Sequence, residues 1–297
     1  MFSPVLDCKG RELVLDQARI CGIVNVTPDS FSDGGRFLDP AAAVSHALRL
    51  VEEGADMLDF GAESTRPGAS PVLASEQIAR VVPVIEAVAA ATNVPISIDT
   101  SDPEVMRAAV AAGAGFVNDV RALRRDGALD AAAELDVVVC LMHMQGEPSD
   151  MQESPNYDDV VGDVHRFLSD RVFACQLAGI DKKRIVVDPG FGFGKTLEHN
   201  LQLLRELARF AEIAPVLAGL SRKSMLATLT GRDKAEDRVF ASVAAAMLAV
   251  QGGAAIVRVH DVAATRDALL VCDAVGKHVG SSRKQSAGAR AVAWDED

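Results

Sequence analysis

The feature that most constrains the fold is a regular alternation of short apolar segments and longer Ala-rich segments along residues 18–278. Apolar runs of this length, bounded by turn residues, are typical of buried strands, and the segments between them have a helical period. Strands are expected at 20–26, 56–60, 95–99, 116–120, 137–143, 184–188, 216–220 and 255–260, and helices at 40–53, 75–91, 103–112, 127–134, 159–178, 199–209, 235–251 and 263–277. Strict alternation implies parallel strands with right-handed crossovers. Eight units predict an α/β fold, a single (β/α)8 TIM barrel; an open doubly wound sheet is disfavoured because no G-x-G-x-x-G follows the first strand.

The ends of the chain differ from this pattern. Two short segments at 4–8 and 12–15 flank Lys9-Gly10, which predicts an N-terminal β-hairpin within residues 1–17. Residues 18–278 show no linker, so we expect one catalytic barrel there. Residues 279–297 are polar and small, and we expect them to form a disordered tail.

Composition excludes several classes of function. The 297 residues carry a net charge of −12, and the only basic run is the short one at 281–284, so neither nucleic acid nor a membrane surface is an expected partner. The longest apolar run, 239–250, is too short to span a bilayer. Charge at Asp7 argues against a signal peptide. The five scattered cysteines predict reduced thiols and a cytoplasmic protein.

Polar residues end nearly every predicted strand. In a barrel of this type, chemistry is carried by the carboxyl ends of the strands. The polar ends are Asn25, Asp59, Asp99, Asn118-Asp119, Met142-His143, Asp188, Ser221-Arg222-Lys223, Arg258 and His260. Such a ring around one mouth predicts an active site.

The ring is chemically mixed. Its cations can hold an anion such as a phosphate, and these are Lys223, Arg258 and His260, with Arg66 nearby. Its acceptors suit a flat, nitrogen-rich heterocycle, and these are Asp99, Asn118 and Asp188. Phe193 and Met142 can sandwich such a ring. Asn25 can bind Mg²⁺ on a phosphate, because Mg²⁺ takes oxygen ligands and keeps several waters.

Two other motifs do not support their usual functions. Residues 190–196 (GFGFGKT) resemble a Walker A loop, but Pro189 stands where its first glycine is needed. His143 and His260 lie on different strands with no third ligand beside them, which argues against zinc.

Eight motifs, in order and one per strand end, together resemble the dihydropteroate synthase family. They are residues 22–35 (GIVNVTPDSFSDGG), 59–68 (DFGAESTRPG), 97–100 (SIDT), 117–120 (VNDV), 141–143 (LMH), 187–195 (VDPGFGFGK), 219–224 (GLSRKS) and 258–261 (RVHD). The resemblance implies a barrel that joins 6-hydroxymethyl-7,8-dihydropterin diphosphate to p-aminobenzoate and releases diphosphate, with Mg²⁺ as cofactor.

The resemblance also implies a role for each matching residue. The pterin would be held by Asp99, Asn118, Met142, Asp188, Phe193 and Lys223. The diphosphate would meet Asn25 with Mg²⁺, together with Thr65, Arg258 and His260. The p-aminobenzoate would lie against Phe31, Ser64, Pro67, Phe191, Ser221 and Lys223. Loop residues Asp33, Ser64 and Arg66 would close over the reaction, and the catalytic set would be Asp99, Lys223, Arg258, His260, Asp33 and Arg66.

The implied mechanism is dissociative, with diphosphate leaving first and Asp99 stabilising a pterin-borne carbocation. Sulfonamides would occupy the p-aminobenzoate site, with Phe31 and Pro67 lining its selective part. Two alternatives remain: a pterin-binding methyltransferase acting on methyltetrahydrofolate, which would not need the diphosphate pocket, and a non-catalytic paralogue. The Ala-rich final helices are also expected to support a homodimer.

Overall fold

A computed structural model describes residues 4–27, 39–63, 72–147 and 150–281, and the predicted barrel is confirmed in it. Eight parallel strands close in the order β10-β3-β4-β5-β6-β7-β8-β9. Their bounds are β3 Arg19–Asn25, β4 Met57–Gly61, β5 Ile96–Asp99, β6 Phe116–Asp119, β7 Val138–Met142, β8 Ile185–Asp188, β9 Val216–Ala218 and β10 Ala254–Val259. Chain order is therefore also the order around the barrel, as right-handed β–α–β crossovers require.

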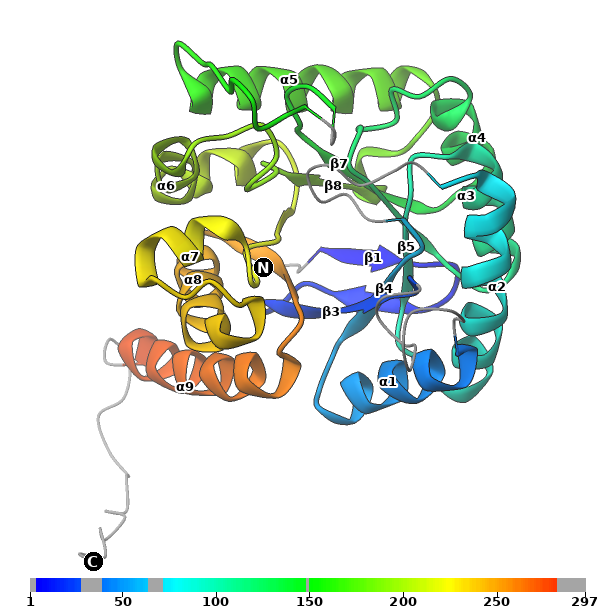
Figure 1. The fold of residues 1–297 in the computed structure, drawn as a ribbon, viewed down its shortest axis with the longest axis horizontal. Coiled ribbons are helices and arrows are strands. Elements are labelled where there is room, and N and C mark those ends of the chain that lie inside the picture. The colour runs from blue at the N-terminus through cyan, green and yellow to red at the C-terminus, as the bar shows by residue number, and fades with distance from the viewer. Residues whose placement is uncertain (1–3, 28–38, 64–71, 148–149, 282–297) are drawn as a thin grey trace, which may run out of the picture.

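Helices surround the strands (Figure 1). Their bounds are α1 Pro40–Glu52, α2 Ala74–Ala91, α3 Pro103–Ala111, α4 Ala128–Leu135, α5 Val160–Leu177, α6 Leu197–Arg205, α7 Ser224–Thr230, α8 Val239–Gln251 and α9 Val262–Ser281. Local chemistry fixes several starts. Asp39 and Asp102 cap α1 and α3 through their carboxylates, and a proline occupies the first helical position after each.

The region around β9 departs from the expected pattern of one helix per strand. The helix expected at 199–209 ends at Arg205 and is followed by a 3-10 helix, Leu207–Glu212. The helix expected at 235–251 begins as a 3-10 turn, Ala235–Arg238, before α8. The short α7 was not expected at all. This helix has seven residues and is followed by Gly231, which adopts a left-handed conformation. A run of seven residues is too short for a helical period to be recognised in the sequence.

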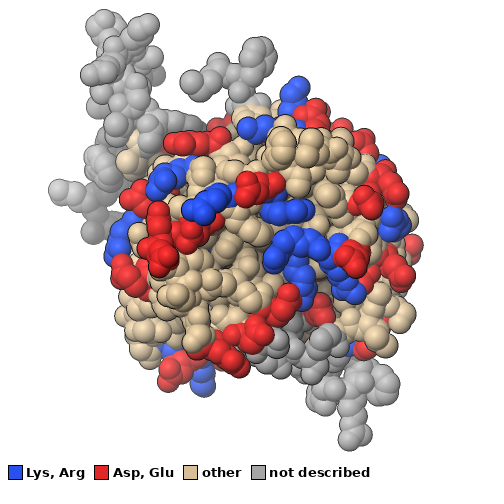
Figure 2. Space-filling view, turned by 90° about the horizontal axis from the view of Figure 1, so that it is seen from above, with Lys and Arg blue, Asp and Glu red and all other residues tan. Residues whose placement is uncertain are grey.

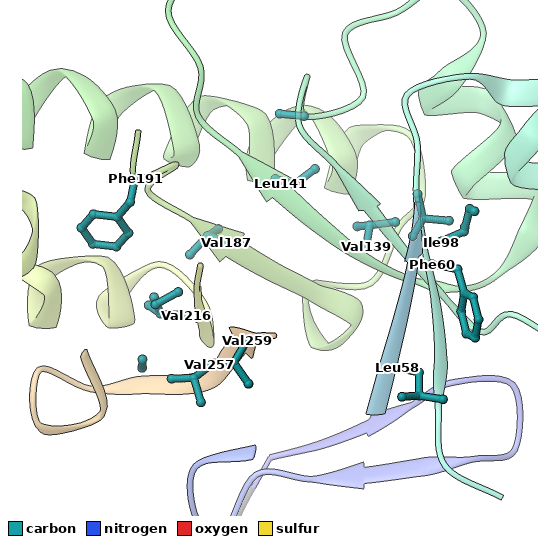
Figure 3. Close-up of a cluster of buried hydrophobic side chains, with 14 of the residues drawn as sticks. Leu58, Phe60, Ile98, Val139, Leu141, Val187, Phe191, Val216, Val257 and Val259 are labelled. Carbon is teal, nitrogen blue, oxygen red and sulfur yellow. The ribbon is translucent and has the colours of Figure 1, made fainter. Parts of the chain in front are cut away.

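Because side chains alternate between the two faces of each strand, the barrel has an outer and an inner hydrophobic core. Alternate residues such as Leu58, Phe60, Ile98 and Val139 point outward to the helices and form the main hydrophobic cluster (Figure 3). Their neighbours in sequence belong to a second cluster inside the barrel, which includes Cys21, Met57, Phe116, Val138, Cys140, Val186, Leu217 and Ile256. Because successive side chains of a strand face opposite sides, the same parity carries the polar residues at the strand ends inward.

The N-terminal hairpin closes one end of the barrel. Strands β1 Val5–Asp7 and β2 Glu12–Val14 pair antiparallel, and β1 crosses the centre of the ring in Figure 1. Leu6, Cys8 and Leu13 pack into the interior cluster. A side chain at Gly115 would collide with the Cys8 backbone, so the hairpin lies directly against the start of β6. Ligands therefore have access from the opposite end.

The cysteines, the helices and the surface charges of the described residues can be compared with the expectations from composition. All five cysteines are free, and four of them are buried. Within the described ranges, no helix is both long and apolar enough to cross a membrane. On the face drawn in Figure 2, basic side chains of the described residues lie among acidic ones.

Candidate active site

A row of inward-facing residues crosses four adjacent strands at the open mouth. Strand register places Asn25 opposite Gly61, Gly61 opposite Asp99, and Asp99 opposite Asn118. Because Gly61 has no side chain, the side chains of Asn25 and Asp99 on the adjacent strands face each other across an open space. A Cβ there would lie 3.9 Å from Asn25 Oδ1 and 4.0 Å from Asp99 Oδ2. An amide oxygen and a carboxylate oxygen thus face the same small space.

Asp59 lies one layer below this row and is the centre of its hydrogen bonding. Its side chain is 1% exposed. Its carboxylate accepts from Ser97 Oγ at 2.5 Å, from Asn118 Nδ2 at 3.0 Å and from Arg258 Nε at 2.6 Å. These bonds set which way the Asn118 amide and the Arg258 guanidinium point. Asp59 was expected in the ring but was given no role from the sequence.

Arg258 joins Asp59 to Asp99. Its Nη2 donates to Asp99 Oδ2 at 3.0 Å. Burial raises the pKa of Asp99 to about 7, with Arg258 opposing that change and the Asp59 charge adding to it. Burial disfavours the charge of Arg258, but Asp59 and Asp99 more than offset this and raise its pKa. The cation is therefore permanent, whereas the carboxyl of Asp99 can titrate near neutral pH.

Asp188 and Lys223 form the opposite side of the mouth. Asp188 is buried and accepts from the Gly190 N–H at 2.7 Å. Burial raises the pKa of Asp188, and Lys223 opposes the shift. Burial lowers the pKa of Lys223 to about 8, against the attraction of Asp188. The two groups therefore influence each other's charge at the site.

Lys223 also contacts the loop that follows β8. Its Nζ donates to the Phe191 carbonyl and lies 4.6 Å from the centre of the Phe193 ring. A cation above a ring face is an attractive arrangement. Phe193 is half-buried and packs on Met142 in a small cluster with Val120, Met144 and Met151. Apolar surfaces for a flat ligand therefore lie beside the acceptors.

Ser221 and His260 lie together at the ends of β9 and β10. The His260 N–H donates to Ser221 Oγ at 3.2 Å, and Ser221 Oγ lies 3.0 Å from His260 Nδ1. The hydroxyl can therefore donate its proton to Nδ1, or accept from Nδ1–H, while it accepts from the backbone. Arg222, at φ 59°, makes a bidentate contact at 2.5 and 3.1 Å with Asp261, the residue that follows His260.

Phe191 departs from its expected position. Its ring is fully buried within the outer cluster that Figure 3 shows, so it presents no side-chain surface at the mouth. What Phe191 offers Lys223 is its backbone carbonyl. The aromatic ring beside Lys223 is that of Phe193.

Several expected site residues cannot be placed. Phe31, Asp33, Ser64, Thr65, Arg66 and Pro67 lie outside the described residues, as do residues 282–297 of the tail expected at 279–297, whose first three residues belong to α9 instead. The described part of the mouth thus contains Asn25, Asp99, Asn118, Met142, Asp188, Phe193, Ser221, Lys223, Arg258 and His260.

A closed parallel barrel whose mouth combines carboxylate and amide acceptors, an aromatic face and cations matches one class of protein, the pterin-binding enzymes. The sequence fits the family model described as pterin binding enzyme over residues 21–260. The dihydropteroate synthase of Neisseria meningitidis serogroup C is 52% identical over 89% of this chain and 95% of its own. The chain belongs to the dihydropteroate synthase family.

Solved structures agree with this assignment. A Xanthomonas albilineans dihydropteroate synthase with 4-aminobenzoic acid is 61% identical, with a TM-score of 0.88 over 92% of this chain and 98% of its own. A Yersinia pestis dihydropteroate synthase in a sulfonamide drug complex is 46% identical, with a TM-score of 0.88 over 92% of this chain and 99% of its own.

Proposed function

We propose that this chain condenses 6-hydroxymethyl-7,8-dihydropterin diphosphate with p-aminobenzoate to give 7,8-dihydropteroate and diphosphate. The observation that carries the proposal is the direct contact of Arg258 with Asp99. Arg258 attracts the diphosphate as it leaves, and Asp99 stabilises the cation that develops on the pterin. The reaction needs both groups beside the exocyclic methylene carbon. The Xanthomonas albilineans relative, solved with 4-aminobenzoic acid, supports p-aminobenzoate as one of the two substrates.

The pterin lies across the mouth of the barrel. Its amino and ring N–H groups suit the carboxylates of Asp99 and Asp188 and the amide of Asn118, which stand at the ends of three different strands. Phe193 and Met142 supply the apolar faces for the flat ring. Lys223, beside both Asp188 and Phe193, supplies a donor.

The diphosphate occupies the cationic side, against Arg258 and His260, with Thr65 from the loop after β4. Asn25 is the residue that would hold Mg²⁺. Among the described residues there is no cluster of three His, Cys, Asp or Glu side chains able to hold a metal. One amide oxygen beside the open space at Gly61 nevertheless fits an ion that keeps its waters and binds mainly to the diphosphate. When bound, Mg²⁺ neutralises charge on the leaving group.

The reaction is a dissociative substitution. The C–O bond to diphosphate breaks, and its electron pair leaves with the diphosphate held by Arg258 and His260. The carbocation left on the exocyclic methylene is stabilised by the ionised carboxylate of Asp99. The amine nitrogen of p-aminobenzoate then forms the C–N bond and loses its proton to solvent. Asp33 and Arg66 would help to keep water from the cation.

The p-aminobenzoate lies nearer the surface, with Ser221 and Lys223 on the barrel side. Phe31, Ser64 and Pro67 would also contact it. Sulfonamides resemble this substrate in shape and charge, and one relative is known in a sulfonamide complex. We therefore propose that this chain is a sulfonamide target.

The direct test is an assay for diphosphate. Release is expected only when the pterin diphosphate, p-aminobenzoate and Mg²⁺ are all present, and EDTA should stop it reversibly. Asn25→Ala should raise the Mg²⁺ concentration needed for half-maximal rate, and a sulfonamide should compete with p-aminobenzoate. Diphosphate release without p-aminobenzoate at the full rate would contradict the proposal.

We further propose that the protein is a cytoplasmic homodimer. Five free cysteines suit a reducing compartment. Helices α8 and α9 contact each other and expose large apolar side chains, namely Phe240, Leu248, Leu270, Val271 and Val275. Large apolar side chains exposed on two neighbouring helices favour an association site there.

The dimer has a simple test. Phe240, with 82% of its surface exposed, should lie in the interface, so Phe240→Glu is expected to convert a dimer into a monomer of 31.3 kDa. Phe173→Glu on α5 is the matched control, because Phe173 is also exposed but lies away from α8 and α9. Light scattering after size-exclusion chromatography measures both. An equal effect of the two variants would remove the argument for this face.

A further inference from the structure

Lys195 is a buried amine with no role in the reaction described above. The residue is 3% exposed, and among the described residues no carboxylate lies within ion-pair distance of it. Its Nζ instead contacts three polar atoms: His143 Nδ1 at 3.0 Å, the His143 carbonyl at 3.3 Å and the Phe193 carbonyl at 2.9 Å. A buried lysine without a counter-ion is costly, so a packing role would be better filled by an apolar residue.

Lys195 and His143 form a pair that does not require charge. Burial lowers the pKa of Lys195 well below its ordinary value, with Asp188 opposing and Lys223 adding to the shift. Burial also lowers the pKa of His143 to about 2, so its ring is neutral. A neutral amine can donate to both carbonyls and accept from Nδ1–H, whereas an ammonium donates to all three atoms. The three contacts of the Lys195 amine are therefore hydrogen bonds in either state.

The two carbonyls belong to different parts of the site. His143 follows β7, and its N–H donates to the Asp188 carbonyl of β8 at 3.0 Å. Phe193 belongs to the glycine loop, which we define as residues 190–194. Lys195 therefore ties the end of β7 to the loop that carries the aromatic ring. At Gly190 the two segments are so close that a Cβ would collide with the His143 carbonyl.

The glycine loop depends on side chains for its shape. Gly190, Gly192 and Gly194 all have positive φ, between 60° and 80°, and the backbone of the loop closes a turn from the Phe193 N–H to the Gly190 carbonyl at 3.1 Å. Four consecutive carbonyls, from Phe191 to Gly194, each accept a side-chain hydrogen bond. The donors are, in order, Lys223, Gln152, Lys195 and Tyr157.

The four donors differ in burial. Gln152 is exposed and Tyr157 is only half-buried, so water can replace either of them. Lys223 is expected to contact the pterin. Lys195 is buried beneath the loop, and no solvent can replace its contacts without opening the structure.

We propose that Lys195, held against His143, is a positioning residue that fixes the Phe193 ring over the pterin site. It touches no substrate and acts through the glycine loop and, by way of the Phe191 carbonyl, on Lys223. The inference rests on the proposed pterin site. The part of the inference that concerns the shape of the glycine loop does not depend on which ligand the site binds.

The test compares Lys195→Met, Lys195→Gln and Tyr157→Phe with the wild-type chain. Met removes both donors to the carbonyls, whereas the Gln amide keeps two N–H donors without a charge. Tyr157→Phe removes the donor to the neighbouring Gly194 carbonyl and is the matched control. Calorimetry measures the Kd for 6-hydroxymethyl-7,8-dihydropterin diphosphate, and amide hydrogen exchange measures the order of residues 190–194 without any ligand.

Lys195→Met is expected to raise the pterin Kd about 10- to 100-fold, because an aromatic ring displaced by about 1 Å loses much of its fit. It should also accelerate exchange across residues 190–194. Lys195→Gln should recover part of both effects, and Tyr157→Phe should change the Kd less than about 3-fold. Unchanged exchange in a folded Lys195→Met protein would overturn the proposal, as would an equal effect of Tyr157→Phe. Failure of the wild-type chain to bind the pterin would instead count against the proposed function, while the exchange result still decides the role of Lys195.

Discussion

Replacing Asp99 with asparagine is expected to lower kcat for diphosphate release by about 100- to 1,000-fold, the usual cost of removing one preorganised electrostatic group. The side chain keeps its shape but loses the charge that stabilises the carbocation. Pterin binding should weaken less, because the asparagine carbonyl still accepts a hydrogen bond. Steady-state kinetics with each substrate varied in turn separates the two effects. Asp130→Asn, on the exposed surface of α4, is the control and should be neutral.

The same residue should shape the pH dependence of the wild-type enzyme. Asp99 must be ionised to work, and its pKa is raised to about 7 by burial. Lys223 must be protonated to act as a cation, and burial lowers its pKa to about 8. The profile of kcat/KM should therefore rise through about 7 and fall above about 8. In the Asp99→Asn variant the residual activity should lose the acidic limb and keep the basic one.

As the pH rises through about 7, the contribution of Asp99 to the stability of the fold should fall while its contribution to activity rises. Because the pKa of Asp99 is raised in the folded state, its carboxyl stabilises the fold most below its unfolded pKa, and this contribution is lost as the pH rises through about 7. Relative to wild type, Asp99→Asn should therefore be more stable at pH 8.5 than at pH 5.5. Melting temperatures at the two pH values test this, and a difference of the opposite sign would mean that the native state favours the ionised carboxyl.

Strand parity explains why so much of the fold and site could be predicted from sequence. An apolar run such as residues 56–60 fixes both a strand and the direction of each side chain, because a residue facing outward forces its neighbours inward. Once Leu58 and Phe60 are assigned to the helices, Asp59 must enter the barrel. The same reasoning brings Asp99, Asn118, Asp188 and Arg258 to one mouth.

The alternation of side chains stops at the strand end, so it could not predict that the ring of Phe191 is buried in the outer cluster. Phe191 and Phe193 are two residues apart and would share a face in an extended strand. The positive φ values of Gly190, Gly192 and Gly194 turn the chain between them, which buries the first ring and leaves the second beside Lys223. A glycine permits such turns without specifying them. The sequence pattern therefore could not tell which ring faces the mouth.

Long-range pairing was the other feature that sequence could not supply. Arg258 and Asp59 lie 199 positions apart and meet at 2.6 Å only because the barrel closes. Lys195 and His143, 52 positions apart, meet beneath a loop in the same way. The chemistry of each residue can be read from its type, but its partner depends on closure, so Asp59 and Lys195 could not be recognised as organising residues in advance.

Asp59→Asn is expected to be the most destabilising single change at the site. It removes the negative charge and one of the two oxygens that accept from Ser97, Asn118 and Arg258, and it leaves a buried guanidinium less well paired. Breaking a buried ion pair by removing one partner costs about 3–5 kcal/mol. Chemical denaturation should show a loss of that order. Asp163→Asn, in an exposed pair with Arg166 at 3.2 Å on α5, should cost less than about 0.5 kcal/mol.

The Asp59 variant also separates a structural role from an electrostatic one. The Asp59 charge adds to the raised pKa of Asp99, and Arg258 opposes it. Without Asp59, Arg258 is left with Asp99 alone, so the acidic limb of the rate profile should move below pH 7 even if the folded fraction is restored by cooling. A purely structural residue would reduce the amount of active enzyme and leave that limb in place. A downward shift of the limb in the folded variant would therefore show that Asp59 sets the charge state of Asp99 as well as holding Asn118 and Arg258 in position.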